Sequence, residues 1–421
     1  SFAQPIVLVP LLAVLITRCL VPIEYAIRAK YRLPVPTKQE NLTAGGSYPD
    51  FLPSITATYG SHGFPLMLSP TNVSRIHTID DFVQWVELHK SWLLDKLAIH
   101  GGLLFRGFGS ALVSNPANFE RLAFTIEPNL ETEYLGTSSR SAVAGTKAVH
   151  TSSDYTGWRI IPSHLEMSFK DVFPQRIFFY AQDPNDGKGG ETPLVDFRQV
   201  LRDLKHSHSG IVERFQQGKI TYIRKYHDLD EGPCYNYFIH KDWQSMFQTN
   251  NATLAGQTAE SNGFEWSFEK ETIASDGSKS YRGTMSLINT RPPSRIHPST
   301  GDEIWSNHMN VLHADSIPAE FAFAAQHLQS WKYVAIYYFF EIAVWLQSLL
   351  AGGKAEIGHH TTHSNGIEMD AKDVEVIKQT VWKNTILYQH QKDDVALLDN
   401  YRVGHGRQPY IGIRRILTAW H

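Results

Sequence analysis

Cysteine is nearly absent from this sequence, which contains only Cys19 and Cys234 in 421 residues. This scarcity excludes a disulfide framework and any zinc site built from four thiolates. An excess of one charge is also missing, because 39 Lys and Arg against 42 Asp and Glu leave a net charge of −3. No electrostatic argument for nucleic-acid binding follows from that balance. Disorder of the whole chain is excluded too, since 42% of the residues are hydrophobic.

Histidine, by contrast, is abundant, with 20 residues. A chain with many imidazoles and few thiolates can build metal sites from histidine and carboxylate, the ligands that suit Fe(II), Zn and Mn. Surplus histidines also occur as ordinary surface residues, so composition raises the question of a metal without answering it.

The first 32 residues form an apolar segment. No charged residue precedes Arg18, and Arg28, Lys30 and Arg32 follow. A membrane-spanning helix needs about 20 apolar residues, and this run is short and interrupted by prolines. We therefore predict a targeting or membrane-associated segment, with residues 1–27 as the part that contacts a membrane. If this segment has that role, the protein is organelle-targeted or membrane-associated. If it does not, the protein is expected to be cytoplasmic.

Residues 33–60 are rich in Pro, Gly, Ser and Thr and are predicted to be a linker or arm. Residues 61–421 are predicted to form one domain with a helical insertion at about 316–358. The most apolar stretch of that insertion, 331–351, is expected to be a long buried helix. The alternative is an interfacial helix or a lid over a site.

Other elements follow from local patterns. Apolar residues at helical spacing predict helices over 80–98 and 370–389, and a hydrophobic run predicts a buried strand over 103–108. Arg106 in that strand is expected to form a structural ion pair. The histidines of the stretch 359–363 are expected to face solvent and are assigned no metal.

A histidine and a glutamate stand two residues apart at His164 and Glu166. On a β-strand such residues point to the same face. A second imidazole would complete a face of two histidines and one carboxylate, which leaves positions open for a cosubstrate and oxygen. Far downstream, His405 precedes the pair Arg414 and Arg415. A histidine beside a strand that carries arginine suits a metal together with a dicarboxylate, because the guanidinium is a two-pronged carboxylate donor.

With these motifs the sequence resembles the taurine dioxygenase/TfdA family of Fe(II)- and 2-oxoglutarate-dependent oxygenases, in the clavaminate-synthase-like superfamily. The matching text, in family order over about residues 60–421, is HGGLLFRGF, SHLEMSF, GGETPLVD, HPSTGDEIW, LLDNYRVGHGRQPY and GIRRIL. The resemblance implies a mainly β fold with α-helices, namely a double-stranded β-helix (jelly roll) core with flanking helices. It also implies a dioxygenase that uses Fe(II), 2-oxoglutarate and O2.

Carried over residue by residue, the resemblance implies that His164, Glu166 and His405 hold Fe(II). It implies further that Arg415 binds the distal carboxylate of 2-oxoglutarate, with Thr192 hydrogen-bonded to the same group.

There is one departure from the family pattern. Many members carry another arginine four residues after the carboxylate-binding one, near the proximal carboxylate, and this chain has Ala419 there. Arg140 or the iron alone would then hold that carboxylate. Arg140, Asn307 and His308 are the candidate contacts to substrate.

The resulting hypothesis is an oxygenase that oxidises an unactivated C–H bond of a small polar metabolite of the amino-acid, amine or carboxylate type, in specialised metabolism. The outcome is hydroxylation, desaturation or oxidative cyclisation, with ring closure of the kainoid-synthase kind among the options. One alternative is a zinc-dependent hydrolase, which leaves Arg415 and Thr192 without a role. Another is a non-catalytic jelly-roll binding protein, which would be expected to have lost one of the three metal ligands. The sequence makes no prediction of oligomeric state.

Overall fold

The structure is a computed structural model that describes residues 43–48, 55–60, 62–72, 74–109, 115–132, 134, 140–185, 189–232 and 241–421. The predicted membrane-associated segment, residues 1–27, lies outside the described residues, and so do both cysteines.

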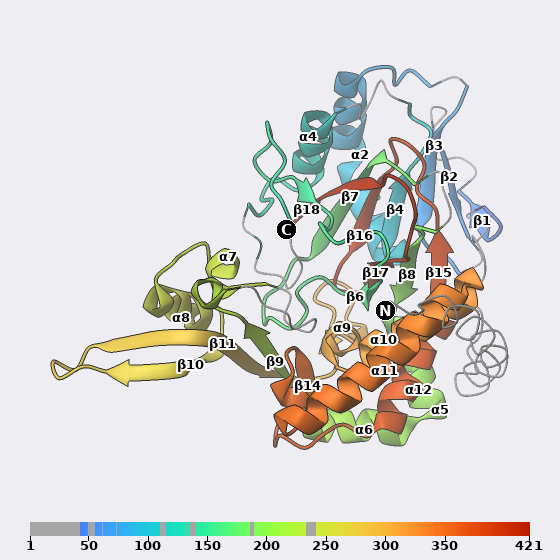
Figure 1. The fold of residues 1–421 in the computed structure, drawn as a ribbon. Helices are drawn as coiled ribbons and strands as arrows, with labels where there is room; N and C mark the ends of the chain where they lie inside the picture. The colour runs from blue at the N-terminus through green and yellow to red at the C-terminus, as the bar shows by residue number, and fades with distance from the viewer. Residues whose placement is uncertain are drawn as a thin grey trace, which may run out of the picture.

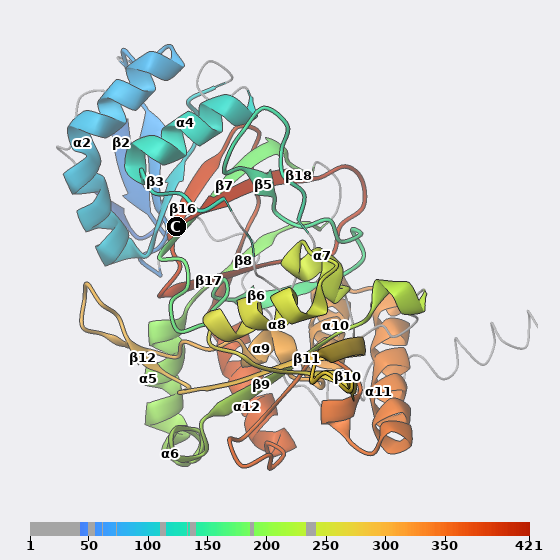
Figure 2. The same cartoon turned by 90° about the vertical axis from the view of Figure 1, so that its left-hand side faces the viewer.

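Two antiparallel sheets build the body of the molecule (Figures 1 and 2). The larger has eight strands in the order β1 (Gly46–Ser47), β2 (Ile55–Tyr59), β3 (Leu66–Pro70), β4 (Gly102–Phe105), β16 (Val395–Asp399), β7 (Arg176–Asp183), β18 (Arg415–Trp420) and β5 (His150–Thr151). The smaller has the order β15 (Thr385–Tyr388), β8 (Thr192–Asp196), β17 (Val403–Arg407) and β6 (Ile161–His164). The pairing of β3 with β4 is parallel.

The two sheets face each other across one hydrophobic core. The ring of Phe179 on β7 lies edge-on to His405 on β17, with centroids 4.8 Å apart. Strand β18 shows how its side chains divide. Ile416 and Trp420 belong to the core between the sheets, whereas Leu417 and Ala419 belong to a second core under the helices on the outer face. Alternate residues of this strand thus face the interior and the helices.

Helices α2 (Ile79–His100) and α4 (Pro116–Ile126) cover the outer face of the larger sheet (Figure 2). α2 begins at a capping box formed by Thr78 and Asp81 and ends at Gly101, whose φ of 70° suits glycine. The helix predicted over 80–98 is confirmed. The buried strand predicted over 103–108 is present as β4 but ends at Phe105. Arg106 forms its expected ion pair, with Asp394, at 2.6 Å.

Helices α5 (Phe197–Ser207), α6 (Ser209–Gly218) and α12 (Ala371–Lys383) pack beyond the smaller sheet. The helix predicted over 370–389 is therefore too long at its C-terminal end. The chain turns at Asn384 and continues as β15, because Thr385–Tyr388 pairs with β8 in the smaller sheet.

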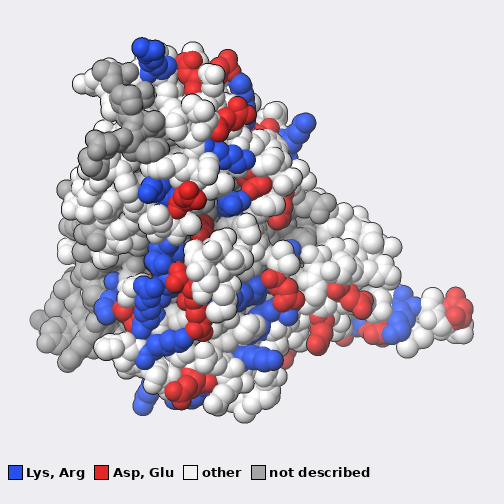
Figure 3. Space-filling model, turned by 180° about the vertical axis from the view of Figure 1, so that it is seen from behind, with Lys and Arg blue, Asp and Glu red and all other residues white. Residues whose placement is uncertain are grey.

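A third sheet has the order β10 (Glu265–Ile273), β11 (Lys279–Arg291), β9 (Ile220–Tyr226) and β14 (His360–Thr362), with α7 (Trp243–Phe247) and α8 (Ala252–Ser261) beside it. The β10–β11 hairpin projects from the body as an arm, yellow in Figure 1. The short elements are η1 (Leu229–Glu231), β12 (Arg295–Ile296), β13 (Glu303–Ile304), α9 (Met309–Leu312) and η2 (Lys354–Glu356). Seen from behind, arm and body carry both signs of charge interspersed (Figure 3).

The region from 316 to 351 contains two packed helices, α10 (Ser316–Leu328) and α11 (Trp331–Ala351). The prediction that α11 is a buried core helix is wrong. One side packs on α10, but the other is open, with Phe339 65%, Trp345 64% and Leu350 78% exposed. Among the described residues, α11 is the one helix that is long and apolar enough to cross a membrane by length and composition.

Candidate active site

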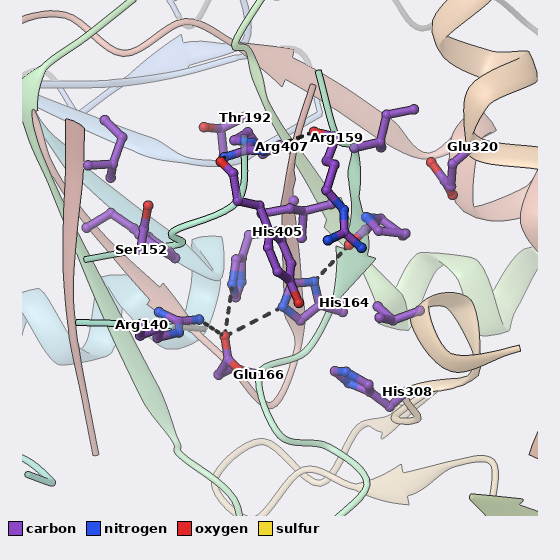
Figure 4. Close-up of a pocket in the computed structure, with 18 of the residues that line it drawn as sticks. Arg140, Ser152, Arg159, His164, Glu166, Thr192, His308, Glu320, His405 and Arg407 are labelled. Atoms are coloured by element: carbon purple, nitrogen blue, oxygen red, sulfur yellow. Dashed lines mark hydrogen bonds and ion pairs between the residues drawn. The ribbon is translucent and has the colours of Figure 1, made fainter. Parts of the chain in front are cut away.

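Three side chains converge between the two sheets (Figure 4). His164 ends β6, and His405 lies opposite it in the middle of β17. Oε2 of Glu166 lies 3.6 Å from Nε2 of His164 and 3.7 Å from Nε2 of His405. One ligand atom from each residue lies within 4.8 Å of the other two, and all three residues are buried. A single metal ion can therefore contact all three.

The sequence predicted that Glu166 lies on the same strand as His164. In the structure Glu166 lies instead in the turn that follows His164. Its main chain is held by Asn400, whose Oδ1 accepts from the Glu166 N–H at 2.7 Å and whose Nδ2 donates to the Glu166 carbonyl at 3.0 Å. The amide thus fixes the carboxylate opposite the two rings.

Hydrogen bonding sets the tautomer that a metal needs at His164. Nδ1 lies 2.8 Å from the carbonyl of Pro162, and a carbonyl can only accept, so Nδ1 carries the proton. The lone pair of Nε2 then faces Glu166, as in metal-binding histidines whose other nitrogen is hydrogen-bonded. Burial lowers the pKa of His405 to about 4, so this ring is neutral at physiological pH.

The carboxylate is ionised. Burial alone would raise the pKa of Glu166, but the charge of Arg140 acts against burial, and the pKa lies well below its usual value. Arg140 Nη2 lies 2.5 Å from Oε2, and the Tyr134 hydroxyl donates to Oε1 at 3.0 Å. The donor set of two neutral imidazoles and one carboxylate fits Fe(II).

A second group of three, His313, His360 and Glu368, has a similar spread of ligand atoms. Here the tautomers are unsuited to a metal. Nδ1 of His360 accepts from the Ala314 N–H at 3.2 Å, and Nδ1 of His313 accepts from the Asp315 N–H at 3.3 Å. Each Nε2 must then carry the proton, and that of His360 donates to Glu368 at 2.9 Å. A protonated Nε2 has no lone pair for a metal.

The pocket beside the first group is lined by both apolar and cationic side chains. The apolar ones come from the segment before His164 and from α9 and α10, and are Ile160, Ile161, Val311, Leu312, Ile317 and Phe321. The cationic ones are Arg140, Arg159, Arg407 and Arg414. Arg407 has a structural role, because both of its Nη atoms donate hydrogen bonds to main-chain carbonyls of residues 155–159 and so hold that segment in place.

Of the adjacent arginines Arg414 and Arg415, Arg414 lines the pocket, whereas Arg415, which was predicted to bind 2-oxoglutarate, does not. Arg414 donates from Nη2 to Thr192 Oγ1 at 3.2 Å and from Nε to the Gly190 carbonyl at 3.1 Å. The side chain of Arg415 is 59% exposed and lies 3.6 Å from Asp183. Alternation along β18 explains the difference, because Arg415 and Ala419 lie on the side of the strand that faces away from the pocket. The residue four positions after Arg414 is Thr418.

Arg414 lacks a carboxylate partner of its own among the described residues. Burial, together with the charge of Arg407, lowers the pKa of Arg414 to about 10. A desolvated cation of this kind is stabilised by an anionic ligand. Thr192, which is buried and lines the pocket, sits beside Arg414.

Of the three residues predicted to contact substrate, two line the pocket and one does not. Arg140 lines the pocket, and its Nε and Nη1 have no partner within the described part of the chain. His308 lines it too, with its ring edge-on to His164 at 5.3 Å. Asn307 does not line it, since its Nδ2 donates to the Pro293 carbonyl at 2.9 Å and its Oδ1 accepts from the Met309 N–H. Its position does not fit a substrate contact.

Several lining residues were missed from sequence. His359, expected to face solvent, is 7% exposed and lines the pocket, and burial lowers its pKa to about 3. Glu320 of α10 also lines it and is paired with Lys378 at 2.9 Å. Tyr134, six positions before Arg140, carried no sequence signal beyond proximity to that arginine.

Two neutral imidazoles and one carboxylate with an open side are the ligand set typical of non-haem Fe(II) oxygenases. Comparison with known proteins agrees. The profile described as "Taurine catabolism dioxygenase TauD, TfdA family" matches residues 73–420. The chain therefore belongs to the TauD/TfdA family, and the protein is an iron- and 2-oxoglutarate-dependent dioxygenase.

Two curated proteins are similar over most of their lengths. The dapdiamide synthesis protein DdaC of Enterobacter agglomerans is 28% identical, covering 85% of this chain and 94% of that protein. A clavaminate synthase-like protein of Arabidopsis thaliana is 27% identical, covering 86% and 94%. Among solved structures, PvcB, an Fe, alpha-ketoglutarate-dependent oxygenase from an isonitrile synthetic pathway, is 13% identical with a TM-score of 0.45, covering 89% of this chain and 93% of that one.

Proposed function

We propose that His164, Glu166 and His405 hold the iron and that the two facing sheets are the double-stranded β-helix of this family. The tautomer of His164 and the ionised state of Glu166 support the ligand assignment. We assign the distal carboxylate of 2-oxoglutarate to Arg414 and Thr192 in place of Arg415. When bound, iron and 2-oxoglutarate supply with O2 the oxidising power that breaks a C–H bond. The residues of the chain orient the reactants and exclude water.

The substrate is proposed to be a small polar metabolite that carries a carboxylate. The observation that carries this proposal is Arg140. Its side chain is buried, with an exposure of 4%. One guanidinium nitrogen, Nη2, pairs with Glu166, and Nε and Nη1 have no hydrogen-bond partner within the described residues. Buried donors without acceptors are costly, and a carboxylate satisfies two of them together. Tyr134 and Trp420 fix the group through ring contacts at 4.5 and 5.5 Å.

The apolar residues that line the pocket support a substrate with a hydrocarbon part. With the carboxylate at Arg140, that part would lie toward Ile317 and Phe321 of α10, which line the pocket. Hydroxylation, desaturation and cyclisation, including ring closure of the kainoid-synthase kind, all begin at such a C–H bond. The similarity to a dapdiamide synthesis protein supports a place in specialised metabolism.

The test is a coupled assay. Purified protein with Fe(II), 2-oxoglutarate and a panel of amino acids, amines and carboxylic acids is followed for succinate and for product mass. A gain of one oxygen identifies hydroxylation, and a loss of two hydrogens identifies desaturation or cyclisation. Absence of succinate under all conditions, with activity retained when zinc replaces iron, would refute the oxygenase assignment in favour of a hydrolase.

The role of Arg140 is tested by comparing each active acid with its primary amide. The loss of a charge-assisted pair should cost about 1.5–3 kcal/mol, or roughly 10- to 150-fold in kcat/KM. Arg140→Gln should erase that preference while leaving the KM for 2-oxoglutarate within about threefold. If Arg140→Gln instead raises the KM for 2-oxoglutarate alone, the arginine binds the cosubstrate's proximal carboxylate and the substrate proposal fails.

A further inference from the structure

The outward side of α11 is a continuous apolar strip. From Phe339 onward its members lie three or four positions from one another, and Trp331 lies eight positions before Phe339, so they share one side of the helix. Large apolar side chains make up the strip, and each is between 44% and 78% exposed: Trp331, Phe339, Ile342, Trp345, Leu346, Leu349 and Leu350. Together they expose an area on the order of 800 Å², more than the largest apolar patch of a typical monomer.

The inward side of α11 is firmly packed, so the helix keeps its place along the body of the protein. Phe340 stacks on Phe321 of α10 with centroids 5.1 Å apart and an interplanar angle of 3°. Tyr333 and Tyr337 are buried in the same cluster. A spanning helix would have to give up these contacts. In Figure 2 the helix lies along the outer edge of the molecule, with α10 on its inner side.

We propose that this strip is a membrane-docking surface, with α11 lying in the plane of the bilayer at the boundary between headgroups and acyl chains. An apolar helical face with tryptophan among aliphatic residues is typical of helices at that depth. Trp331 stands at the first position of α11, and Trp345 lies two thirds of the way along it. The charged residues of the helix are Lys332, at its N-terminal end beside Trp331, and Glu341.

A second copy of the chain is a poorer occupant. A protein interface of standard size carries about ten hydrogen bonds, and its apolar centre has a polar rim. The strip offers almost none of these groups, and the hydroxyl of the neighbouring Ser348 is already bonded to the Trp345 carbonyl at 2.9 Å. The mixed charges seen from behind in Figure 3 contrast with this uncharged strip.

The sequence contains a second element of the same chemistry. Residues 5–17 are nearly all apolar, and Arg18, Arg28, Lys30 and Arg32 follow them. Basic residues next to an apolar segment are attracted to anionic headgroups. Stable attachment generally takes two weak anchors, and α11 would supply one of them. Docking through α11 would also bring the pocket close to the bilayer, because Phe321 lies between the helix and the pocket.

The test uses the full chain with vesicles of phosphatidylcholine containing one quarter phosphatidylglycerol. Hydrogen exchange of peptides that cover 331–351 should slow when vesicles are added. The double variant Ile342→Glu with Leu349→Glu should lower the vesicle partition coefficient by about 100-fold, because two apolar side chains are lost from the contact. The matched control is Leu88→Glu with Ile273→Glu, which changes residues of similar exposure, 79% and 65%, elsewhere on the surface. It should bind within twofold of the parent.

Three results would overturn the proposal. Vesicle binding without slower exchange in 331–351 would assign attachment to the N-terminal segment alone. Slow exchange without lipid in a dimer that the double variant dissociates would assign the strip to a second copy. Slow exchange without lipid in a monomer would show that another part of the chain covers it. Circular dichroism of both variants checks that each is folded.

Discussion

Replacement of Arg414 by alanine should weaken the binding of 2-oxoglutarate far more than replacement of its neighbour Arg415. The two residues have the same side chain and are adjacent, yet one guanidinium lies in the pocket beside Thr192 and the other is 59% exposed beside Asp183. This pair is therefore an internally matched test of which arginine the cosubstrate meets.

The magnitude follows from what each guanidinium can do. A buried, two-pronged contact to a carboxylate contains two charge-assisted hydrogen bonds, each worth about 1.5–3 kcal/mol. Loss of both should cost at least about 3 kcal/mol, which corresponds to a rise of two to three orders of magnitude in the KM for 2-oxoglutarate. The Arg415–Asp183 pair is exposed, and exposed pairs contribute about 0–1 kcal/mol. Arg415→Ala should therefore change that KM by less than threefold.

The assay measures succinate release against 2-oxoglutarate concentration, with iron content determined for each variant. Arg414→Ala should retain its iron, because the residue is not among the three proposed ligands. Thermal unfolding checks that the loss of the bonds to Thr192 and Gly190 has not unfolded the protein. A larger rise in KM for Arg415→Ala than for Arg414→Ala would refute the assignment and the alternation argument behind it.

Three further predictions concern the site and its support. Glu166→Ala should abolish iron binding measured by metal analysis, whereas Asn400→Ala, which frees the Glu166 main chain, should weaken it and leave some bound metal. Burial lowers the pKa of His405 to about 4 and of His308 to about 3. As the pH falls below about 6.5, these histidines take up protons in the unfolded chain but stay neutral in the folded protein. The free energy of unfolding is therefore highest above about pH 6.5 and decreases as the pH falls toward 4. The free energy of unfolding of the iron-free protein from urea titrations should fall over that window by up to about 1.4 kcal/mol per pH unit for each ring. Gly404→Ala should destabilise the fold by about 1–3 kcal/mol in the same titrations, because a Cβ there would lie 2.2 Å from the Phe197 ring.

The local features of the site were largely predictable from sequence. His164 and Glu166 are close in the chain, so their meeting needed little tertiary information, and His405 lay in a recognisable motif. The choice between Arg414 and Arg415 was not predictable, because it depends on which side of β18 faces the smaller sheet. A shift of one residue moves a side chain to the opposite face of a strand. Only the packing of Ile416 and Trp420 into the interior decides it.

The position of α11 escaped prediction for a different reason. Apolar residues occur on all sides of this helix. Hydropathy alone therefore does not predict which side packs on the protein and which side remains open. His359 illustrates the reverse case, since a polar residue in a loop-like sequence is buried against the pocket. In both cases the environment comes from segments remote in the chain.

The contrast between His164 and His360 bears on how metal specificity is encoded in this chain. Both imidazoles are buried and both stand near a second histidine and a glutamate. One ring meets a main-chain oxygen at Nδ1 and the other a main-chain hydrogen. The direction of a single peptide dipole therefore separates a proposed metal ligand from a structural hydrogen-bond donor, although the two groups contain the same residue types.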